Sequence, residues 1–196
     1  MRQWMMRITA YSEKLLSGLE GLNWTDSIKE AQRNWIGRSE GALVRFKTAS
    51  GGNVEVFTTR PDTIYGVSFM VLAPEHELVS ELTTEENRTA VEEYIVAAGR
   101  KSERERQGEK EVTGVALGGS VLHPLTGEDI PVYIAEYVLA GYGTGAIMAV
   151  PAGDERDWKF AKHFNIEIPA IFEGVDTDDA VCTEEDALLT DSGELN

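Results

Sequence analysis

The sequence has few of the residues typical of secreted or membrane-embedded proteins. Cys182 is the only cysteine among 196 residues, which excludes an internal disulfide and a cysteine-based metal cluster. No apolar run approaches the length of a membrane span, and the first residues lack the apolar core of a signal peptide. We therefore expect a soluble, cytoplasmic protein with no membrane partner.

Positive charge is also scarce. The 18 Lys and Arg residues stand against 34 Asp and Glu residues, and the formal net charge is −16. No Lys or Arg follows Lys162, whereas ten Asp and Glu residues do. This balance argues against tight autonomous binding of RNA, because contacts with phosphates supply most of such affinity.

The pattern of apolar residues changes near residue 37. Before it, apolar residues recur at helical spacing over residues 2–20, and Ser27 with Glu30 forms a candidate capping box for a second helix that ends near Trp35. This stretch has too few other apolar residues to cover its tryptophans. We expect residues 1–36 to form a helical appendage that docks on a surface absent from this chain.

From Gly37 onward the pattern indicates short strands with a few inserted helices. A curled mixed β-sheet or β-barrel core of the α/β class, surrounded by helices, fits this order of elements. The mixed charges of residues 100–110 predict a solvated segment. The expected strands lie at 44–47, 54–59, 67–72, 115–121, 130–133 and 146–150, and the expected helices run from a cap at 83–86 to about Gly99 and from Asp154 onward.

The stretch 141–160 carries the first candidate site. Three glycines at 141, 143 and 145 let a backbone approach a ligand closely. Asp154 is a candidate N-cap, and Asp157 lies in the first helical turn, where the helix dipole favours ionised carboxylates. These two anions beside a glycine-lined backbone predict a site for a cationic group, and they argue against binding of a dinucleotide pyrophosphate.

The second candidate site is the turn Thr58-Thr59-Arg60-Pro61-Asp62-Thr63, at the end of an expected strand. Hydroxyls and backbone amides suit ribose and phosphate, and the Arg60 guanidinium suits a phosphate or a carboxylate. The alternative is a polar turn in which Asp62 satisfies local backbone amides. The spacing alone does not decide between the two.

Two other chemistries need weighing. Asp62, Asp154, Glu155 and Asp157 could furnish a hard oxygen site for a divalent cation, whereas the three histidines are scattered and zinc is not expected. Residues 37–41 match the G-x-S-x-G pattern of serine hydrolases, but a helix precedes them and a strand follows, which reverses the order that the nucleophile elbow requires.

Several motifs resemble the editing domain, connective peptide 1, of the bacterial-type leucyl-tRNA synthetases of class I. The isoleucyl and valyl relatives share the threonine-rich and GTG elements in looser form, and the residues from 148 to 164 and from 38 to 41 resemble the leucyl branch more closely. The motifs extend over nearly the whole chain: QRNWIGRSEG (32–41), which resembles the entry from the catalytic body, TTRPDTIYGV (58–67), LAPEH (72–76) and GYGTGAIMAVPAGDERD (141–157).

This resemblance implies a hydrolase that deacylates tRNA(Leu) mischarged with norvaline, isoleucine or methionine. The implied partners are the 3′ end of that tRNA and the catalytic body of the same synthetase. No cofactor is implied for the domain, whereas ATP and magnesium serve the absent body, whose HIGH and KMSKS signatures do not occur here. We expect a fragment of a larger ligase, with residues 1–36 belonging to the body or linker and 37–196 forming the editing domain.

The resemblance also implies roles for single residues. Asp157 holds the substrate α-ammonium, Thr63 blocks the leucine side chain, and a positioned water attacks the ester, since no activated Ser, Cys or His is evident. The implied catalytic residues are Asp157, Thr58, Thr59 and Arg60, and the implied substrate-binding residues are Thr63, Tyr142, Gly143, Met148, Val150 and Asp154, with no metal.

One position departs from the family pattern. Gly153 stands where the family commonly has histidine, so either that histidine is dispensable or hydrolysis here is slower. Two other functions remain open from the residues alone. One is a non-catalytic module that binds a tRNA end or docks on a protein, and the other is a metal-dependent hydrolase.

Overall fold

The computed structural model describes residues 7–108, 111–141, 143–177, 179–182, 187–190 and 193. The chain divides into two compact units, Met1–Glu40 and Gly41–Asn196. Within the described residues no helix is both long enough and apolar enough to cross a membrane.

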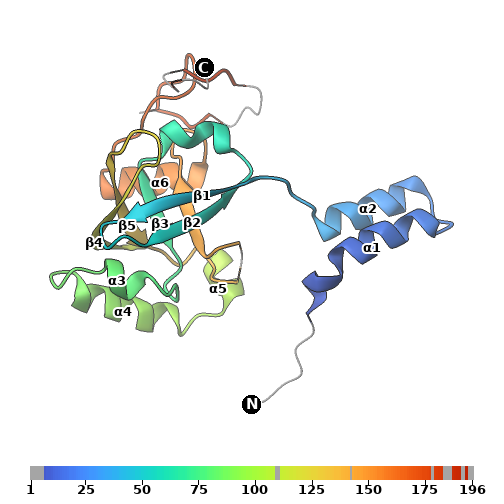
Figure 1. Ribbon diagram of the computed structural model, residues 1–196, viewed down its shortest axis with the longest axis horizontal. Coiled ribbons are helices and arrows are strands. Elements are labelled where there is room, and N and C mark those ends of the chain that lie inside the picture. Colours follow the sequence, from blue (N-terminus) through green and yellow to red (C-terminus); the bar gives the residue numbers. More distant parts are fainter. Residues whose placement is uncertain are drawn as a thin grey trace. The chain divides into compact units, whose positions relative to one another are not determined.

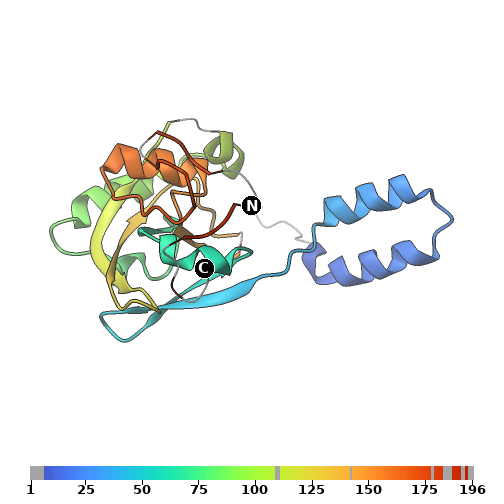
Figure 2. The same cartoon turned by 90° about the horizontal axis from the view of Figure 1, so that it is seen from above.

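The first unit consists of two helices that lie side by side (Figure 2). The helix α1 (Ser12–Gly18) is flanked by the 3-10 turns η1 (Ile8–Tyr11) and η2 (Leu19–Gly21), and α2 spans Asp26–Ile36. The predicted capping box is wrong, because Thr25 is the N-cap and its side chain caps no backbone N–H. Trp35 is 89% exposed and Leu19 is the only buried apolar residue described in this unit, so the two helices form almost no core between them.

The second unit is built on a six-stranded mixed sheet (Figure 1). Only β3 and β5 pair in parallel, and the other neighbouring pairs are antiparallel. The two end strands of the order β2-β1-β4-β5-β3-β6 contact each other, so the sheet nearly closes into a barrel, as predicted. The strands are β1 (Ala42–Thr48), β2 (Asn53–Thr58), β3 (Phe69–Leu72), β4 (Val115–Leu122), β5 (Asp129–Ile134) and β6 (Ala146–Ala149).

Strand β3 is buried on both faces, which explains its uninterrupted apolar sequence. Because side chains alternate along a strand, Met70 and Leu72 enter the main core, whereas Phe69 and Val71 enter a second core. Phe160 of helix α6 (Glu155–Phe164) stacks on Phe69 in that second core, with ring centroids 5.0 Å apart. This contact fixes α6 against the sheet.

The helices between β3 and β4 differ from the expectation. Helix α4 (Arg88–Ala98) begins later than predicted, after Asn87, and no side chain caps it. The predicted capping residue Thr83 instead forms an isolated bridge with Gly118. A short helix that was not expected, α3 (Val79–Leu82), precedes this bridge, and both α3 and α4 contact β4.

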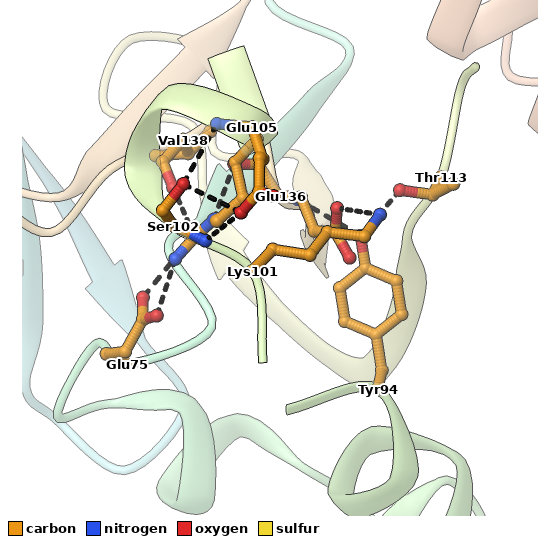
Figure 3. A network of polar contacts seen from close by, with 9 residues as sticks. Glu75, Tyr94, Lys101, Ser102, Glu105, Thr113, Glu136 and Val138 are labelled. Atoms are coloured by element: carbon orange, nitrogen blue, oxygen red, sulfur yellow. Dashed lines mark hydrogen bonds and ion pairs between the residues drawn. The ribbon is translucent and has the colours of Figure 1, made fainter. Parts of the chain in front are cut away.

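The charged segment 100–110 is not simply solvated, which corrects the prediction for its described residues. Most of it forms α5 (Glu103–Gly108). Arg106 is only 5% exposed, and its guanidinium donates hydrogen bonds to the Glu75 carboxylate and to the carbonyls of Glu136 and Val138 (Figure 3). This mixed-charge segment therefore contains a buried arginine that pairs with an exposed glutamate.

Candidate functional site

A pocket of about 350 Å³ opens where three segments of the second unit meet. The first segment follows β2, the second runs from β6 into α6, and the third belongs to the acidic C-terminal part of the chain. Their contributions to the lining are Thr58, Thr59, Arg60 and Thr63, then Met148, Val150, Gly153, Asp154 and Asp157, then Phe172 and Cys182. Three segments that lie apart in the sequence thus build one site.

The turn after β2 is held by its own side chains. Thr58 Oγ1 accepts a hydrogen bond of 3.1 Å from the Arg60 N–H, and Thr63 Oγ1 donates one of 3.0 Å to the Arg60 carbonyl. The Arg60 guanidinium pairs with the Asp62 carboxylate at 2.8 Å, and this bond lowers the pKa of Asp62. Asp62 thus orients Arg60 beside the pocket, and the Thr63 side chain is held within the turn.

Asp154 caps α6, as predicted. Pro151 follows β6, and the chain then turns so that Asp154 Oδ1 accepts the backbone N–H groups of Arg156 at 2.8 Å and Asp157 at 3.1 Å. These bonds satisfy two of the donors that a helix leaves free at its first turn. The cap directs the start of α6, and with it Asp157, toward the pocket.

Asp157 is the buried anion of the site, since it is only 6% exposed. Its Oδ2 accepts the Val150 N–H at 2.9 Å, and its Oδ1 accepts the hydroxyl of Tyr137 at 3.3 Å. Burial, with a smaller contribution from the Asp154 charge, raises the pKa of Asp157 from its ordinary value of 3.8 to about 7. A cation that entered the pocket would favour the ionised carboxylate.

The remaining wall of the pocket is apolar and buried. Met148 and Val150 come from β6 and its end, as the sequence predicts for a pocket beside that strand. Phe172 and Cys182, which were not expected, come from the acidic C-terminal segment. Phe172 pairs with Leu189 in an isolated bridge, and the Cys182 N–H donates to the Ala152 carbonyl at 2.8 Å. The bridge joins two parts of this segment, and the Cys182 bond ties the segment to the residues after β6.

Comparison with known proteins assigns the chain to a family. The family model described as the leucyl-tRNA synthetase editing domain matches residues 33–196. The chain belongs to the leucyl-tRNA synthetase editing-domain family. The motifs of the β2 turn and of the β6–α6 segment, which carried the resemblance, supply two of the three segments that line the pocket described above.

The relatives are much longer than this chain. The leucine–tRNA ligase of Porphyromonas gingivalis is 56% identical over 196 residues, which covers 98% of this chain and 21% of the relative. That of Chlamydia felis is 55% identical over 91% of this chain and 22% of its own length. A crystal structure of the ternary complex of Agrobacterium radiobacter K84 agnB2 LeuRS-tRNA-LeuAMS superimposes with a TM-score of 0.73, at 38% identity, and covers 91% of this chain and 22% of that one. The chain therefore spans about a fifth of the length of these proteins.

Not every predicted residue of the editing domain lies in the pocket. Gly143 adopts a φ of 60° but does not line it. The glycines precede β6, whereas the pocket lies at the far end of this strand, and each residue of a strand advances the chain by about 3.3 Å. The expected glycine-lined backbone beside the carboxylates is therefore wrong for this pocket. Tyr142 lies outside the described residues.

The acidic residues of the editing domain do not form a metal site in the described part of the chain. No three His, Cys, Asp or Glu side chains converge there in a way that could hold an ion. Asp62 is paired with Arg60, and Glu155 forms an ion pair with Lys159 at 2.6 Å. The four carboxylates considered as ligands of a divalent cation therefore each bind partners of their own.

The histidines described in this domain do not line the pocket either. His123 is buried, with its Nε2 bonded to the Ile64 carbonyl at 2.9 Å and its Nδ1 accepting two backbone N–H groups. His76 Nδ1 accepts the Leu78 N–H, and burial lowers the pKa of its imidazole. These contacts make both histidines structural, and they leave Cys182 without a histidine partner among the pocket residues.

Proposed function

We propose that the pocket hydrolyses the ester bond of tRNA(Leu) that carries norvaline, isoleucine or methionine. The observation that carries this proposal is the buried Asp157 carboxylate, which lines the same pocket as an apolar wall and as Thr58 and Thr59. An aminoacyl ester of tRNA carries a complementary group for each of these features, namely an ammonium, an aliphatic side chain and a ribose. The reaction adds water to the ester and releases the amino acid and a free terminal hydroxyl.

In this proposal the Asp157 carboxylate binds the α-ammonium through a charge-assisted hydrogen bond. Desolvation raises the pKa of Asp157, and pairing with a cation in a buried site offsets that cost. The carboxylate thus favours a charged amine over a neutral group of the same shape. Removing this anchor would leave the ester free to move away from the attacking water.

The apolar wall would select the side chain. Binding alone separates aliphatic side chains that differ by a methylene by only about 1–3 kcal/mol, so a second, separate pocket improves fidelity. Met148, Val150, Phe172 and Thr63 all line the space available to the substrate. We propose that Thr63 excludes the branched γ-carbon of leucine.

The attacking group would be water. The described pocket residues include no histidine that could activate Cys182 as a nucleophile. The hydroxyls of Thr58 and Thr59, with the ribose hydroxyl of the substrate, would orient and polarise the water, while Arg60, held by Asp62, supports the turn that carries them. Asp154, Met148 and Val150 shape the site without entering the reaction.

The wider context is also a proposal. Residues 1–36 would belong to the catalytic body or linker of a leucine–tRNA ligase, and that body would use ATP and magnesium and supply most of the affinity for tRNA. The exposed apolar faces of α1 and α2 support this assignment, because they have no core of their own. The domain itself would need no cofactor.

The direct test is release of amino acid from tRNA(Leu) charged with norvaline, isoleucine or leucine. The 196-residue chain is assayed alone and after exchange for the matching segment of a full-length leucine–tRNA ligase, each with and without EDTA. We expect release of amino acid from the mischarged tRNAs and little release from leucyl-tRNA. The rates with and without EDTA should be the same. Loss with EDTA would favour a metal-dependent hydrolase, and no release in either context would favour a binding module.

A further inference from the structure

Tyr137 contacts the Asp157 carboxylate from outside the pocket lining. It lies between β5 and β6, and its hydroxyl donates to Asp157 Oδ1 at 3.3 Å. The other oxygen, Oδ2, accepts the Val150 backbone N–H at 2.9 Å. Each carboxylate oxygen therefore has one described donor, and Tyr137 supplies the only one that comes from a side chain in the described part of the chain.

Hydrogen bonds hold the backbone of the residues before and after Tyr137, which are Glu136 and Val138 (Figure 3). Arg106 Nε donates to the Glu136 carbonyl and its Nη2 to the Val138 carbonyl, both at 3.0 Å. The Glu136 N–H donates to the Tyr94 hydroxyl at 3.0 Å. Three hydrogen bonds thus hold the residues before and after Tyr137, and two of them come from one planar guanidinium.

The clamp is itself anchored. Arg106 is 5% exposed and forms an ion pair with Glu75 at 2.6 Å. Lys101 pairs with the Glu136 carboxylate at 2.7 Å. A buried guanidinium that satisfies two backbone carbonyls is costly to displace, because each partner would lose its hydrogen bond in a site with little water. The segment 136–138 therefore has little freedom to rotate.

The Tyr137 ring is held by packing as well. It meets the Phe160 ring edge to face, with centroids 6.1 Å apart. Phe160 lies on α6 one turn after Asp157, so a single helix face carries both partners of Tyr137. The ring and the hydroxyl are fixed by the same element that presents the carboxylate.

We propose that Tyr137 is a positioning residue for Asp157, and that Arg106 acts on Asp157 by clamping the segment that carries Tyr137. This inference rests on the proposed function, in which Asp157 must meet the substrate ammonium in one orientation. The hydroxyl bond fixes the orientation of the carboxylate plane and supports its ionised form. The Val150 N–H holds the other carboxylate oxygen from the backbone, where only a substitution by proline would remove the donor.

The other groups around Asp157 act differently. Asp154 raises the pKa of Asp157 and Arg156 lowers it, both from the start of α6. Across the pocket, Arg60 is paired with Asp62. The C-terminal segment contributes Phe172 and Cys182 to the lining. Of the groups named, only the Tyr137 hydroxyl and the Val150 N–H donate a described hydrogen bond to the carboxylate.

The test is the pH profile of deacylation by the Tyr137→Phe variant, with Tyr133→Phe as the matched control. Tyr133 also meets Phe160 edge to face, at 5.4 Å, but does not contact Asp157 through a described hydrogen bond. We expect the acidic limb of the Tyr137→Phe profile to move up by about one pH unit, with a roughly tenfold loss below it and recovery at high pH. Identical profiles for the two variants would overturn the proposal.

A second readout separates this proposal from the proposed function. NMR titration of the Asp157 side-chain carbon needs no substrate, and the pKa of Asp157 should rise in Tyr137→Phe and stay unchanged in Tyr133→Phe. A shift in the titration with no deacylation by any variant would reject the proposed function and keep the positioning role. No shift in the titration would reject the positioning role.

The clamp is tested with Arg106→Lys, which keeps the charge and loses the two-carbonyl fork. Arg106→Lys should move the profile in the same direction as Tyr137→Phe, and should add nothing in the Tyr137→Phe background. Additive shifts would show that Arg106 does not act through Tyr137. If Arg106→Lys does not fold, Tyr94→Phe removes the acceptor of the Glu136 N–H. A shift of its profile in the same direction would support the effect of holding the segment 136–138, and an unchanged profile would reject it.

Discussion

A β-carbon placed on Gly153 would stand 3.2 Å from Cε2 of the Phe172 ring. This distance is shorter than ordinary van der Waals contact, so the ring occupies the space beside Gly153. The histidine that the resemblance implies for this position would require the Phe172 ring to shift. In this chain an aromatic ring from the C-terminal segment therefore completes a wall of the pocket.

Phe172 should act as part of the sieve. Phe172→Ala is expected to enlarge the pocket, raise hydrolysis of leucyl-tRNA relative to norvalyl-tRNA, and cost about 3–5 kcal/mol of stability because the side chain is buried. Leu188→Ala is the control, since Leu188 lies on the same segment and is 69% exposed. Deacylation of both tRNAs by each variant is the measurement. Unchanged selectivity in a folded Phe172→Ala protein would place the sieve elsewhere.

Thr63 can be tested by separating its bulk from its hydroxyl. Its hydroxyl is bonded to the Arg60 carbonyl, so Thr63→Ala alone would change two things at once. We expect Thr63→Val, which keeps the branching, to spare leucyl-tRNA, and Thr63→Ala to hydrolyse it. Thr63→Tyr should block hydrolysis of norvalyl-tRNA too. If Thr63→Val also lost selectivity, the hydrogen bond and not the bulk would be the discriminating feature.

The pH dependence of stability reports on Asp157. Its folded pKa, about 7, lies above the ordinary 3.8, so between these values the native state keeps a proton that the unfolded state loses. The stability that this group contributes is present below pH 4 and falls as the pH rises toward 7. The side chain introduced by Asp157→Asn cannot ionise, so this position no longer lowers the stability of the protein as the pH rises.

We therefore expect Asp157→Asn to gain stability over the wild type between pH 4.5 and 8, by up to roughly 4 kcal/mol for a shift of about three units. Urea unfolding of both proteins at the two pH values measures the difference. A difference between the proteins that stays constant with pH would show that Asp157 is not desolvated as described.

Binding of tRNA by the chain alone should be weak and sensitive to salt. The formal net charge is −16, and phosphate contacts provide most of the affinity for RNA. We expect the affinity for tRNA(Leu), measured by fluorescence anisotropy, to fall steeply between 50 and 200 mM salt and to be far below that of a full-length ligase. Tight binding by the chain alone at physiological salt would contradict this expectation.

Local patterns were sufficient to predict most of the barrel. Apolar and polar residues alternate along β1 and β2 on either side of Gly51, and β3 is apolar throughout. Both patterns follow from burial, which also determines the register of the strands. The Asp154 cap was predictable for a similar reason, because its partners are its own neighbours in the chain. The site residues after β2 and in α6 were predictable because each group lies within one short sequence motif.

The missed residues depend on contacts between distant segments. Phe172 and Cys182 lie in an acidic stretch with little periodicity, and only the adjacent apolar pair Ile171 and Phe172 hinted at burial. Arg106 lies among mixed charges, and nothing in its spacing shows that Glu75 and the carbonyls of residues 136 and 138 would enclose it. Tyr137 likewise gains its role from Asp157, which is 20 residues away.

The most direct test of the account is hydrolysis of norvalyl-tRNA(Leu) by Asp157→Ala. The Asp157 carboxylate is proposed to anchor the α-ammonium, and loss of a buried charge pair costs about 2–5 kcal/mol, or roughly 30-fold to several thousand-fold in rate. Glu155→Ala is the control, because Glu155 lies two residues earlier on α6 and its side chain is 68% exposed. We expect Asp157→Ala to fold and to lose this hydrolysis, and Glu155→Ala to retain it. Near-normal hydrolysis by folded Asp157→Ala would show that the carboxylate does not anchor the substrate.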